Sequence, residues 1–318
     1  MKQLDIIVAN RFQIVNFISS GAYGDIYEAT DLESKTKERV ALKMERTKFP
    51  DSLTRESVFY EKLQKGKTTG MLKLHFPTDI CDDYRVMGID LLGPSLWDLK
   101  HFCGGKFSLK TVLLIVEQAL FRLKSLHDRG IIHRDLKPDN FLMGRGRQGN
   151  VIYLVDMGLA QERVEAPGNP MDYEGHKALS FVGTNDYAPR AAHRLHYQTY
   201  RDDMESFGYV LIDLLKDVLP WGHMTTSVGG VTPQDRMGRM KEQISLDNLC
   251  KDLPEVFKHY FEHVRSLRYN QRPDYTKLRQ MFLSEFKRQG FHHDFVFDWT
   301  QRRFDQAAEE SYVSFSSE

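Results

Sequence analysis

The sequence lacks an excess of charge of either sign. Its 318 residues include 44 Lys and Arg against 44 Asp and Glu, so the formal net charge is zero. A protein that holds a nucleic-acid backbone nonspecifically needs a basic excess, and a polybasic arm would be expected for an anionic membrane surface. We therefore expect no direct nucleic-acid partner. Hydrophobic residues make up 41% and charged residues 28%, as in ordinary globular proteins.

Long apolar runs are missing as well. The longest, Val112–Val116 and Val151–Val155, have five residues each, whereas a membrane-spanning helix needs about 20. Asp5 interrupts the apolar stretch near the start, so no signal-peptide pattern is present. We expect a protein without a membrane span.

Cysteine is scarce, and the three residues present are far apart: Cys81, Cys103 and Cys250. Their spacing fits neither a metal site nor a disulfide framework. We expect them to be buried or half-buried small side chains. The pattern favours an intracellular protein, in the cytoplasm, the nucleus or both.

The first 90 or so residues contain alternating apolar patterns that predict strands at Arg11–Ser19, Asp25–Asp31 and Arg39–Arg46. A helix should follow, capped by one of the polar residues at 51, 52 or 54 and ended by Gly66. Its predicted buried face carries Glu56 beside Tyr60 and Leu63. A glutamate on such a face needs a positive partner.

From about residue 94 the pattern becomes helical. Ser108 should begin a helix that Gly130 ends, with a buried stripe of Leu113, Val116, Leu120 and Leu123. Three further helices are predicted, at Arg201–Leu215, Pro254–Arg268 and Pro273–Gln289. A polar loop, His133 to Asn140, and a short apolar strand that ends at Asp156 lie between the first of these helices and the other three.

The polar loop carries the most specific motif. His133 to Asn140 reads H-R-D-L-K-P-D-N, which matches the H-R-D-L-x-x-x-N signature of phosphoryl transfer without a gap. Asp135 would accept or orient the proton of an acceptor hydroxyl, and Asn140 would bind magnesium. Lys137 would lie near the transferring phosphate. The alternative, a charged surface turn, explains fewer of the matched positions.

Asp156-Met157-Gly158 follows sixteen residues after Asn140 and resembles D-F-G with methionine in the middle position. Asp156 would be the main magnesium ligand. Upstream, Val40-Ala41-Leu42-Lys43 matches V-A-I-K, and the strand pattern places Ala41 and Lys43 on one face, which should be the nucleotide side. Lys43 would hold the phosphates of ATP and pair with Glu56.

The glycine-rich loop is the weakest match, because a serine, Ser19, replaces the first glycine of G-x-G-x-x-G. Gly21 and Gly24 can still let backbone amides approach phosphates. We assign Ile18 and Ile26, which flank these glycines, to the ATP site as well. An ordinary hairpin turn explains this stretch equally well.

With these motifs in place, the chain resembles a eukaryotic protein kinase, and within that class the casein kinase I family and its tau-tubulin-kinase-like relatives. The resemblance covers roughly residues 8 to 299. It is carried by Leu91–Leu96, Lys106–Leu113, Asn140–Gly144, Arg201–Leu211, Leu219–Trp221, Pro273–Tyr275, Arg288–Phe291 and Val296–Trp299.

The resemblance implies an α+β, bilobal kinase fold, with a kinase domain at 8–299. Its small β-rich N-lobe would span about residues 8–90, and its larger helical C-lobe about 94–299. It also implies a monomeric serine/threonine kinase that uses ATP and Mg²⁺ on protein substrates. A pseudokinase or scaffold is the alternative, although all the residues needed for catalysis are present.

Further roles follow from the same resemblance. Thr184 would bond Asp135 and Lys137, and Asp203 would anchor the catalytic loop. Ile89 would be the gatekeeper. The hinge that binds adenine would run from Asp90 to Leu92.

The sequence also departs from the family. Asp186 stands where an arginine usually helps to bind a phosphate on primed substrates, while Arg236 keeps a basic residue downstream. We therefore predict no preference for phosphate-primed substrates. Alternatively, Arg190, which lies in a replaced motif, could enter the phosphate pocket. The tail, residues 300–318, carries serines at 311, 314, 316 and 317, and we expect it to be a frayed terminus.

Overall fold

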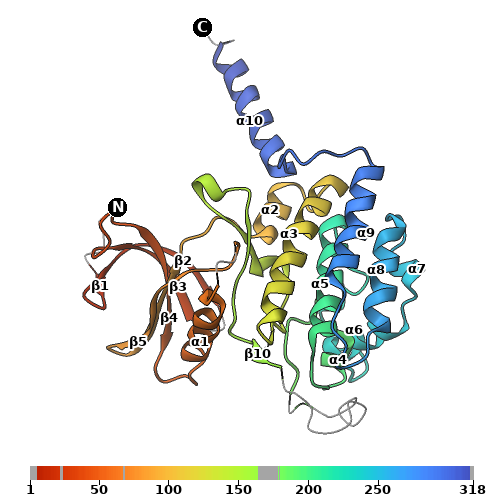
Figure 1. Cartoon of the computed structure of the whole chain (residues 1–318), viewed down its shortest axis with the longest axis horizontal. Coiled ribbons are helices and arrows are strands. Elements are labelled where there is room, and N and C mark those ends of the chain that lie inside the picture. The colour runs from red at the N-terminus through yellow and green to blue at the C-terminus, as the bar shows by residue number, and fades with distance from the viewer. Residues whose placement is uncertain (1–5, 22–23, 67–68, 164–177, 179, 316–318) are drawn as a thin grey trace. The chain divides into compact units, whose positions relative to one another are not determined.

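The chain divides into a strand-rich unit and a mainly helical unit (Figure 1). The computed structural model describes residues 6–21, 24–66, 69–163, 178 and 180–315, with side chains described to residue 307. The first unit comprises Met1–Gly93 and Leu142–Ala160, and the second comprises Pro94–Phe141 and Gln161–Glu318. The predicted N-lobe did not include Leu142–Ala160, which carries Asp156.

A six-stranded antiparallel sheet in the order β1-β2-β3-β4-β6-β5 forms the first unit. The strands are β1 (Ile7–Val8), β2 (Phe12–Gly21), β3 (Gly24–Asp31), β4 (Arg39–Arg46), β5 (Leu74–Cys81) and β6 (Tyr84–Asp90). The three strands predicted from the alternating patterns are thus confirmed, β4 with the predicted bounds. A second, two-stranded sheet joins β8 (Phe141–Met143) to β9 (Ile152–Leu154).

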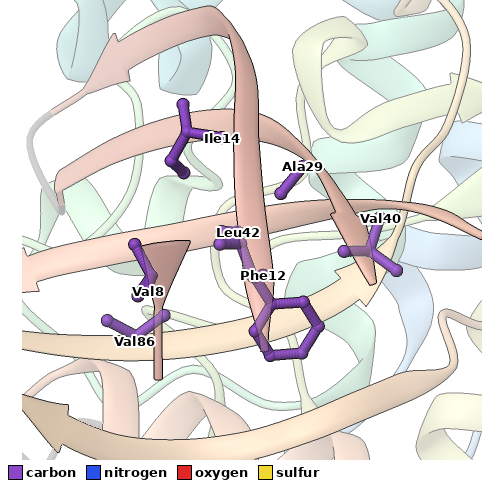
Figure 2. Close-up of a cluster of buried hydrophobic side chains, with 7 residues drawn as sticks. All are labelled: Val8, Phe12, Ile14, Ala29, Val40, Leu42 and Val86. Carbon is purple, nitrogen blue, oxygen red and sulfur yellow. The ribbon is translucent and has the colours of Figure 1, made fainter. Parts of the chain in front are cut away.

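One face of the large sheet is closed by an apolar cluster. Figure 2 shows its seven buried side chains, which come from five strands: Val8, Phe12, Ile14, Ala29, Val40, Leu42 and Val86. Directly paired residues of antiparallel strands share a face, and Ala29 pairs with Val40 in the ladder between β3 and β4. Since side chains alternate along a strand, the neighbours of these residues point to the other face.

Helix α1 (Leu53–Gln64) packs against β5. The Asp51 carboxylate accepts a hydrogen bond from the Thr54 backbone N–H at 3.0 Å, whereas Ser52, which occupies the N-cap position, makes no side-chain capping bond. Glu56, Tyr60 and Leu63 are all buried, which confirms the face predicted from their spacing.

The second unit is built mostly from helices. They are α2 (Leu96–Phe102), α3 (Leu109–Asp128), α4 (Arg190–His193), α5 (Tyr200–Leu215), α6 (Pro233–Gln243), α7 (Leu246–Leu249), α8 (Glu255–Ser266), α9 (Tyr275–Arg288) and α10 (Asp298–Phe315). A small two-stranded sheet pairs β7 (Ile131–Ile132) with β10 (Gln161–Glu162). The predicted helices at 109–129, 201–215, 254–268 and 273–289 correspond to α3, α5, α8 and α9. Helices α2 and α6 were not predicted.

Helix α3 is the helix that the sequence predicted between Ser108 and Gly130. The Ser108 hydroxyl caps it by accepting from the Thr111 N–H at 3.3 Å, and Gly130 follows its end with a φ of 75°. The apolar stripe predicted for this helix is buried, at 0–3% exposure. Helices α3 and α9 pack against each other.

The expectation of a frayed tail is wrong, because α10 runs from Asp298 to Phe315. The Asp298 carboxylate accepts hydrogen bonds from the Ser108 backbone N–H and hydroxyl, at 2.5 and 2.6 Å. The ring of Trp299 stacks on Phe297 and lies 5.2 Å from the ring of Phe107. The start of α10 is therefore tied to the start of α3.

Within the described residues, no helix is both long enough and apolar enough to cross a membrane. The three cysteines are free, with Cys250 buried and the other two half-buried, which confirms the prediction for them. Burial raises the pKa of the Cys103 and Cys250 thiols to about 11.

Candidate active site

In the first unit, a buried lysine meets two carboxylates. The Lys43 Nζ lies 2.7 Å from the Glu56 Oε2 and 3.2 Å from the Asp156 Oδ1. Strand β4 places Lys43 on the face opposite the apolar cluster, and α1 supplies Glu56. The structure thus contains the ion pair that the sequence predicted. It also joins Asp156, which lies 113 residues away from Lys43.

Charge neutralisation explains how this lysine is tolerated at 7% exposure. Burial alone would lower the pKa of Lys43, but the carboxylates of Glu56 and Asp156 outweigh burial and raise it above its ordinary value. Burial raises the pKa of Glu56, and the Lys43 ammonium opposes that rise. Lys43 therefore stays positively charged, as a group that holds phosphates must.

Tyr60, one helical turn after Glu56, is a site residue that the sequence did not reveal. Its hydroxyl accepts a hydrogen bond from the Asp156 backbone N–H at 2.9 Å. Asp156 has a φ of 65°, a left-handed conformation that a non-glycine residue adopts at a cost. The bond from the Asp156 N–H to Tyr60 thus stabilises an unusual backbone at the expected magnesium ligand. Burial was predicted for Tyr60, but no sequence signal links it to position 156.

The predicted nucleotide pocket lies along the face that carries Lys43. Ile26 pairs directly with Lys43 across β3 and β4, and Ala41 pairs with Ile89 across β4 and β6. All four side chains therefore share one face of the sheet. Ile18 lies at a register irregularity between β2 and β3 and is 47% exposed.

Gly21 and Gly24 close the β2–β3 hairpin as a directly paired couple. The two residues between them, 22 and 23, lie outside the described residues. A Cβ at Gly24 would lie 2.1 Å from the Met44 carbonyl oxygen, and its φ is 118°, so glycine is required there. Among the described residues beyond its chain neighbours, the atom nearest to a Cβ at Gly21 would be the Gly24 carbonyl oxygen, at 4.0 Å. The available space and the backbone conformation thus restrict Gly24 to glycine more strictly than Gly21.

The predicted hinge follows β6. The Asp90 carboxylate accepts from the Lys73 backbone N–H and lies 2.8 Å from the His75 Nε2, which fixes it to the start of β5. Because the Asp90 carboxylate already binds Lys73 and His75, a contact between Asp90 and adenine would have to be made by the Asp90 backbone. Leu92 lies in the extended residues after β6, next to Gly93, whose N–H donates to the Met143 carbonyl.

In the second unit, the catalytic-loop residues form a network around Asp135. The Thr184 hydroxyl donates to the Asp135 Oδ1 at 2.7 Å, and the Lys137 Nζ lies 3.1 Å from the Asp135 Oδ2. The same Nζ lies 3.4 Å from the Thr184 hydroxyl oxygen. The structure therefore brings together the three residues that the resemblance had grouped. A carboxylate held between a cation and a hydroxyl is oriented to receive a proton.

Asn140 and Asp156 were predicted to bind magnesium. The Asn140 Nδ2 donates to the Asp135 carbonyl at 2.8 Å, which fixes the amide so that its oxygen is the atom suited to a metal. Carboxylate and amide oxygens are the donors that Mg²⁺ prefers. Among the described residues, no group of three or more His, Cys, Asp or Glu could hold a metal. The donor chemistry of each of the two residues, taken by itself, therefore fits magnesium.

Asp203, on α5, anchors the backbone of the catalytic loop. Its carboxylate accepts from the backbone N–H groups of His133 and Arg134, at 2.7 and 2.9 Å. His127 adds a third bond at 2.8 Å from its Nε2. Although burial would raise the pKa of Asp203, these partners lower it below its ordinary value. Arg134 has a φ of 67°, so the anchor stabilises a strained loop.

Asp186, Arg190 and Arg236, which were assigned to the substrate pocket, each interact with different residues. Asp186 is half-buried, and burial raises its pKa while Lys241 opposes the rise. The Arg190 Nε donates to the Glu205 Oε1 at 2.6 Å. The Arg236 Nη1 donates to the Thr226 carbonyl at 2.9 Å.

The comparison with known families identifies this architecture. The family model described as the protein kinase domain matches residues 12–283. The chain therefore belongs to the protein kinase family, and the predicted α+β fold with a β-sheet N-lobe and a helical C-lobe is confirmed.

Proposed function

We propose that the protein is a serine/threonine protein kinase of casein-kinase-I type that transfers the γ-phosphoryl group of ATP to protein hydroxyls with the help of Mg²⁺. The observation that carries the proposal is the Asp135 network. Asp135, Lys137 and Thr184 are joined by contacts of 2.7 to 3.4 Å, in a loop that Asp203 anchors. A loop that served only as a scaffold would not need an oriented, partly buried carboxylate.

The residues divide the chemistry among them. Asp135 would orient the acceptor hydroxyl and accept its proton, and Lys137 would stabilise negative charge beside it. Lys43, kept charged by Glu56, would hold the phosphates. Bound magnesium would neutralise charge on the phosphates, with Asn140 and Asp156 as ligands.

The finer family assignment is supported by two motifs that carry the resemblance. Lys106–Leu113 and Val296–Trp299 lie far apart in the sequence, yet Asp298 binds the Ser108 N–H and hydroxyl. The Thr111 hydroxyl accepts in turn from the Asp298 N–H at 3.0 Å. This reciprocal contact gives a structural reason for both motifs to occur in one chain.

Activity is tested by incubating the purified protein with ATP, Mg²⁺ and a broad serine, threonine and tyrosine peptide library. We expect phosphoserine and phosphothreonine products, which Asp135→Asn abolishes. Asp139→Asn is the matched control, since Asp139 is an exposed carboxylate of the same loop. Products that depend equally on both residues, or no products at all, would favour the pseudokinase alternative.

We further propose that phosphate-primed substrates are not preferred. Asp186 would repel a substrate phosphate, and the bond from Arg190 to Glu205 commits that guanidinium elsewhere. A positional-scanning library compares wild type with Asp186→Arg. We expect phosphoserine selection upstream of the acceptor only in the variant, and strong selection by wild type would contradict the proposal.

A further inference from the structure

Lys241, on α6, lies buried beneath the segment that follows Thr184. Its side chain is completely buried, and its Nζ donates to the carbonyl oxygens of Asn185 and Ala188, at 2.6 and 2.8 Å. The Nζ also lies 3.1 Å from the His193 Nε2. An ammonium group has three N–H donors, so three neutral groups match its full hydrogen-bonding capacity.

Aromatic rings surround the same ammonium. The Nζ lies 4.9 Å from the ring centroid of Trp221 and 5.2 Å from that of Tyr209, distances at which a cation is attracted to a ring face. The Trp221 Nε1–H donates to the Asp186 carbonyl at 2.8 Å. Lys241 and Trp221 together therefore bind the carbonyl groups of residues 185, 186 and 188.

Helix α6 reaches this position because of a glycine. A Cβ at Gly238 would lie 2.8 Å from the Cβ of His193 and 2.9 Å from its Cγ. Only a residue without a side chain lets α6 approach α4 this closely. The close approach brings Lys241, one turn further along α6, under the segment.

The segment is also bound to the catalytic loop and to α5. The Thr184 hydroxyl donates to Asp135, and the Tyr187 hydroxyl donates to the Asp213 carboxylate at 3.1 Å. Residues 184–188 are thus bound through the Thr184 and Tyr187 hydroxyls as well as through the carbonyl groups that Lys241 and Trp221 bind. Asp186 and Tyr187 also line a cavity of about 210 Å³.

We propose that Lys241 is a positioning residue that holds residues 185–188 in the conformation that binds protein substrate. The inference rests on the proposed kinase function, in which this segment contacts the peptide. Without Lys241, the carbonyl groups of the half-buried Asn185 and the buried Ala188 would lose the hydrogen bonds from its Nζ, which is costly in a protein interior. The segment would then sample other conformations.

The test compares Lys241→Met, which has no donor, with Lys241→Gln, whose amide has two. Because the two hydrogen bonds to Asn185 and Ala188 are lost, we expect Lys241→Met to raise the KM for a peptide substrate by about tenfold. The KM for ATP should stay close to wild type, and Lys241→Gln should lie between the two. Lys216→Met is the matched control, since Lys216 donates to the Leu249 carbonyl at 3.2 Å and leaves residues 185–188 untouched.

Hydrogen exchange provides a readout that does not need activity. The N–H groups of Tyr187 and Ala188 donate to the Thr184 carbonyl, and their exchange should accelerate in Lys241→Met but not in Lys216→Met. If Lys241→Met does not fold, Lys241→Gln carries the same expectation with a smaller effect. Unchanged exchange, or equal rises in both KM values, would overturn the proposal. An inactive wild type with accelerated exchange in the variant would overturn the kinase function but keep the positioning role.

Discussion

Lys43 in the first unit and Lys241 in the second are both buried but have different electrostatic surroundings. Lys43 contacts the carboxylates of Glu56 and Asp156, which raise its pKa above the ordinary value despite burial. Lys241 contacts carbonyl groups, and burial lowers its pKa to about 7, with only partial compensation from Asp186 and Glu205. The charge of the partner therefore decides the charge of a buried lysine. A permanently charged lysine suits phosphate binding, and one that can lose its proton suits a structural contact.

The largest contrast is expected in catalysis. Lys43→Met removes the proposed phosphate-binding cation, so kcat should fall by about 10²-fold or more. Lys241→Met should leave kcat near the wild-type value, because the Lys241 Nζ binds the carbonyl groups of Asn185 and Ala188, in the segment proposed to bind peptide, rather than Asp135 or Lys137. Steady-state kinetics with peptide and ATP varied separately measure both. A similar loss of kcat in the two variants would show that the two lysines do not differ in their effect on catalysis.

The second contrast concerns stability. Lys43→Met leaves Glu56 buried without its cation, which should cost about 3–5 kcal/mol of unfolding free energy. The double variant Lys43→Met with Glu56→Gln removes both charges and should recover much of that loss. Urea denaturation of the single and double variants gives the coupling energy. If the stability losses of the two single substitutions simply add in the double variant, the coupling energy between Lys43 and Glu56 is small.

The third contrast is the response to pH. In the window from about pH 7 to 10.5, Lys241 is neutral in the folded state and protonated in the unfolded state. The unfolded state binds more protons there, so stability attributable to Lys241 rises with pH, by at most about 1.4 kcal/mol per pH unit. Lys43 has a raised pKa, so its contribution is constant below its unfolded value and is lost only above it.

Urea denaturation at several pH values between 7 and 9 separates the two lysines. The stability difference between wild type and Lys241→Met should increase with pH. The difference between wild type and the Lys43→Met, Glu56→Gln double variant should remain flat, because Lys241 titrates equally in both proteins and the raised pKa of Lys43 keeps its contribution constant in this range. Parallel curves for the two comparisons would show that Lys241 keeps its proton in the folded protein.

The same two lysines show what the sequence could predict. Lys43 and Glu56 lie in a strand and a helix whose patterns are local, so their faces could be read and their pairing inferred. Lys241 lies on α6, a largely polar helix that was not predicted, and its partners are carbonyl groups that every residue carries. Nothing in the sequence marks a carbonyl as a partner across 53 residues. The inclusion of Asp156 in the first unit depends on chain topology and was likewise beyond the local pattern.

The smallest effect is expected from Asp186, whose carboxylate raises the pKa of Lys241 through its charge. Asp186→Asn keeps the size of the side chain and the backbone carbonyl that binds Trp221, but removes the charge. The pKa of Lys241 should then fall further, by less than about one unit, because burial remains and one favourable charge is lost. In the folded state Lys241 would therefore lose its proton at a lower pH.

The measurement compares Asp186→Asn with the double variant that also carries Lys241→Met, by urea denaturation from pH 5 to 9. The rise of their stability difference should begin at a lower pH than the rise between wild type and Lys241→Met. Glu205 is bound to Arg190 and Tyr209 and is unchanged in every protein of this set, so the shift reports the Asp186 charge alone. An unshifted rise would mean that solvent screens Asp186 from Lys241, leaving Glu205 as the carboxylate that opposes the effect of burial.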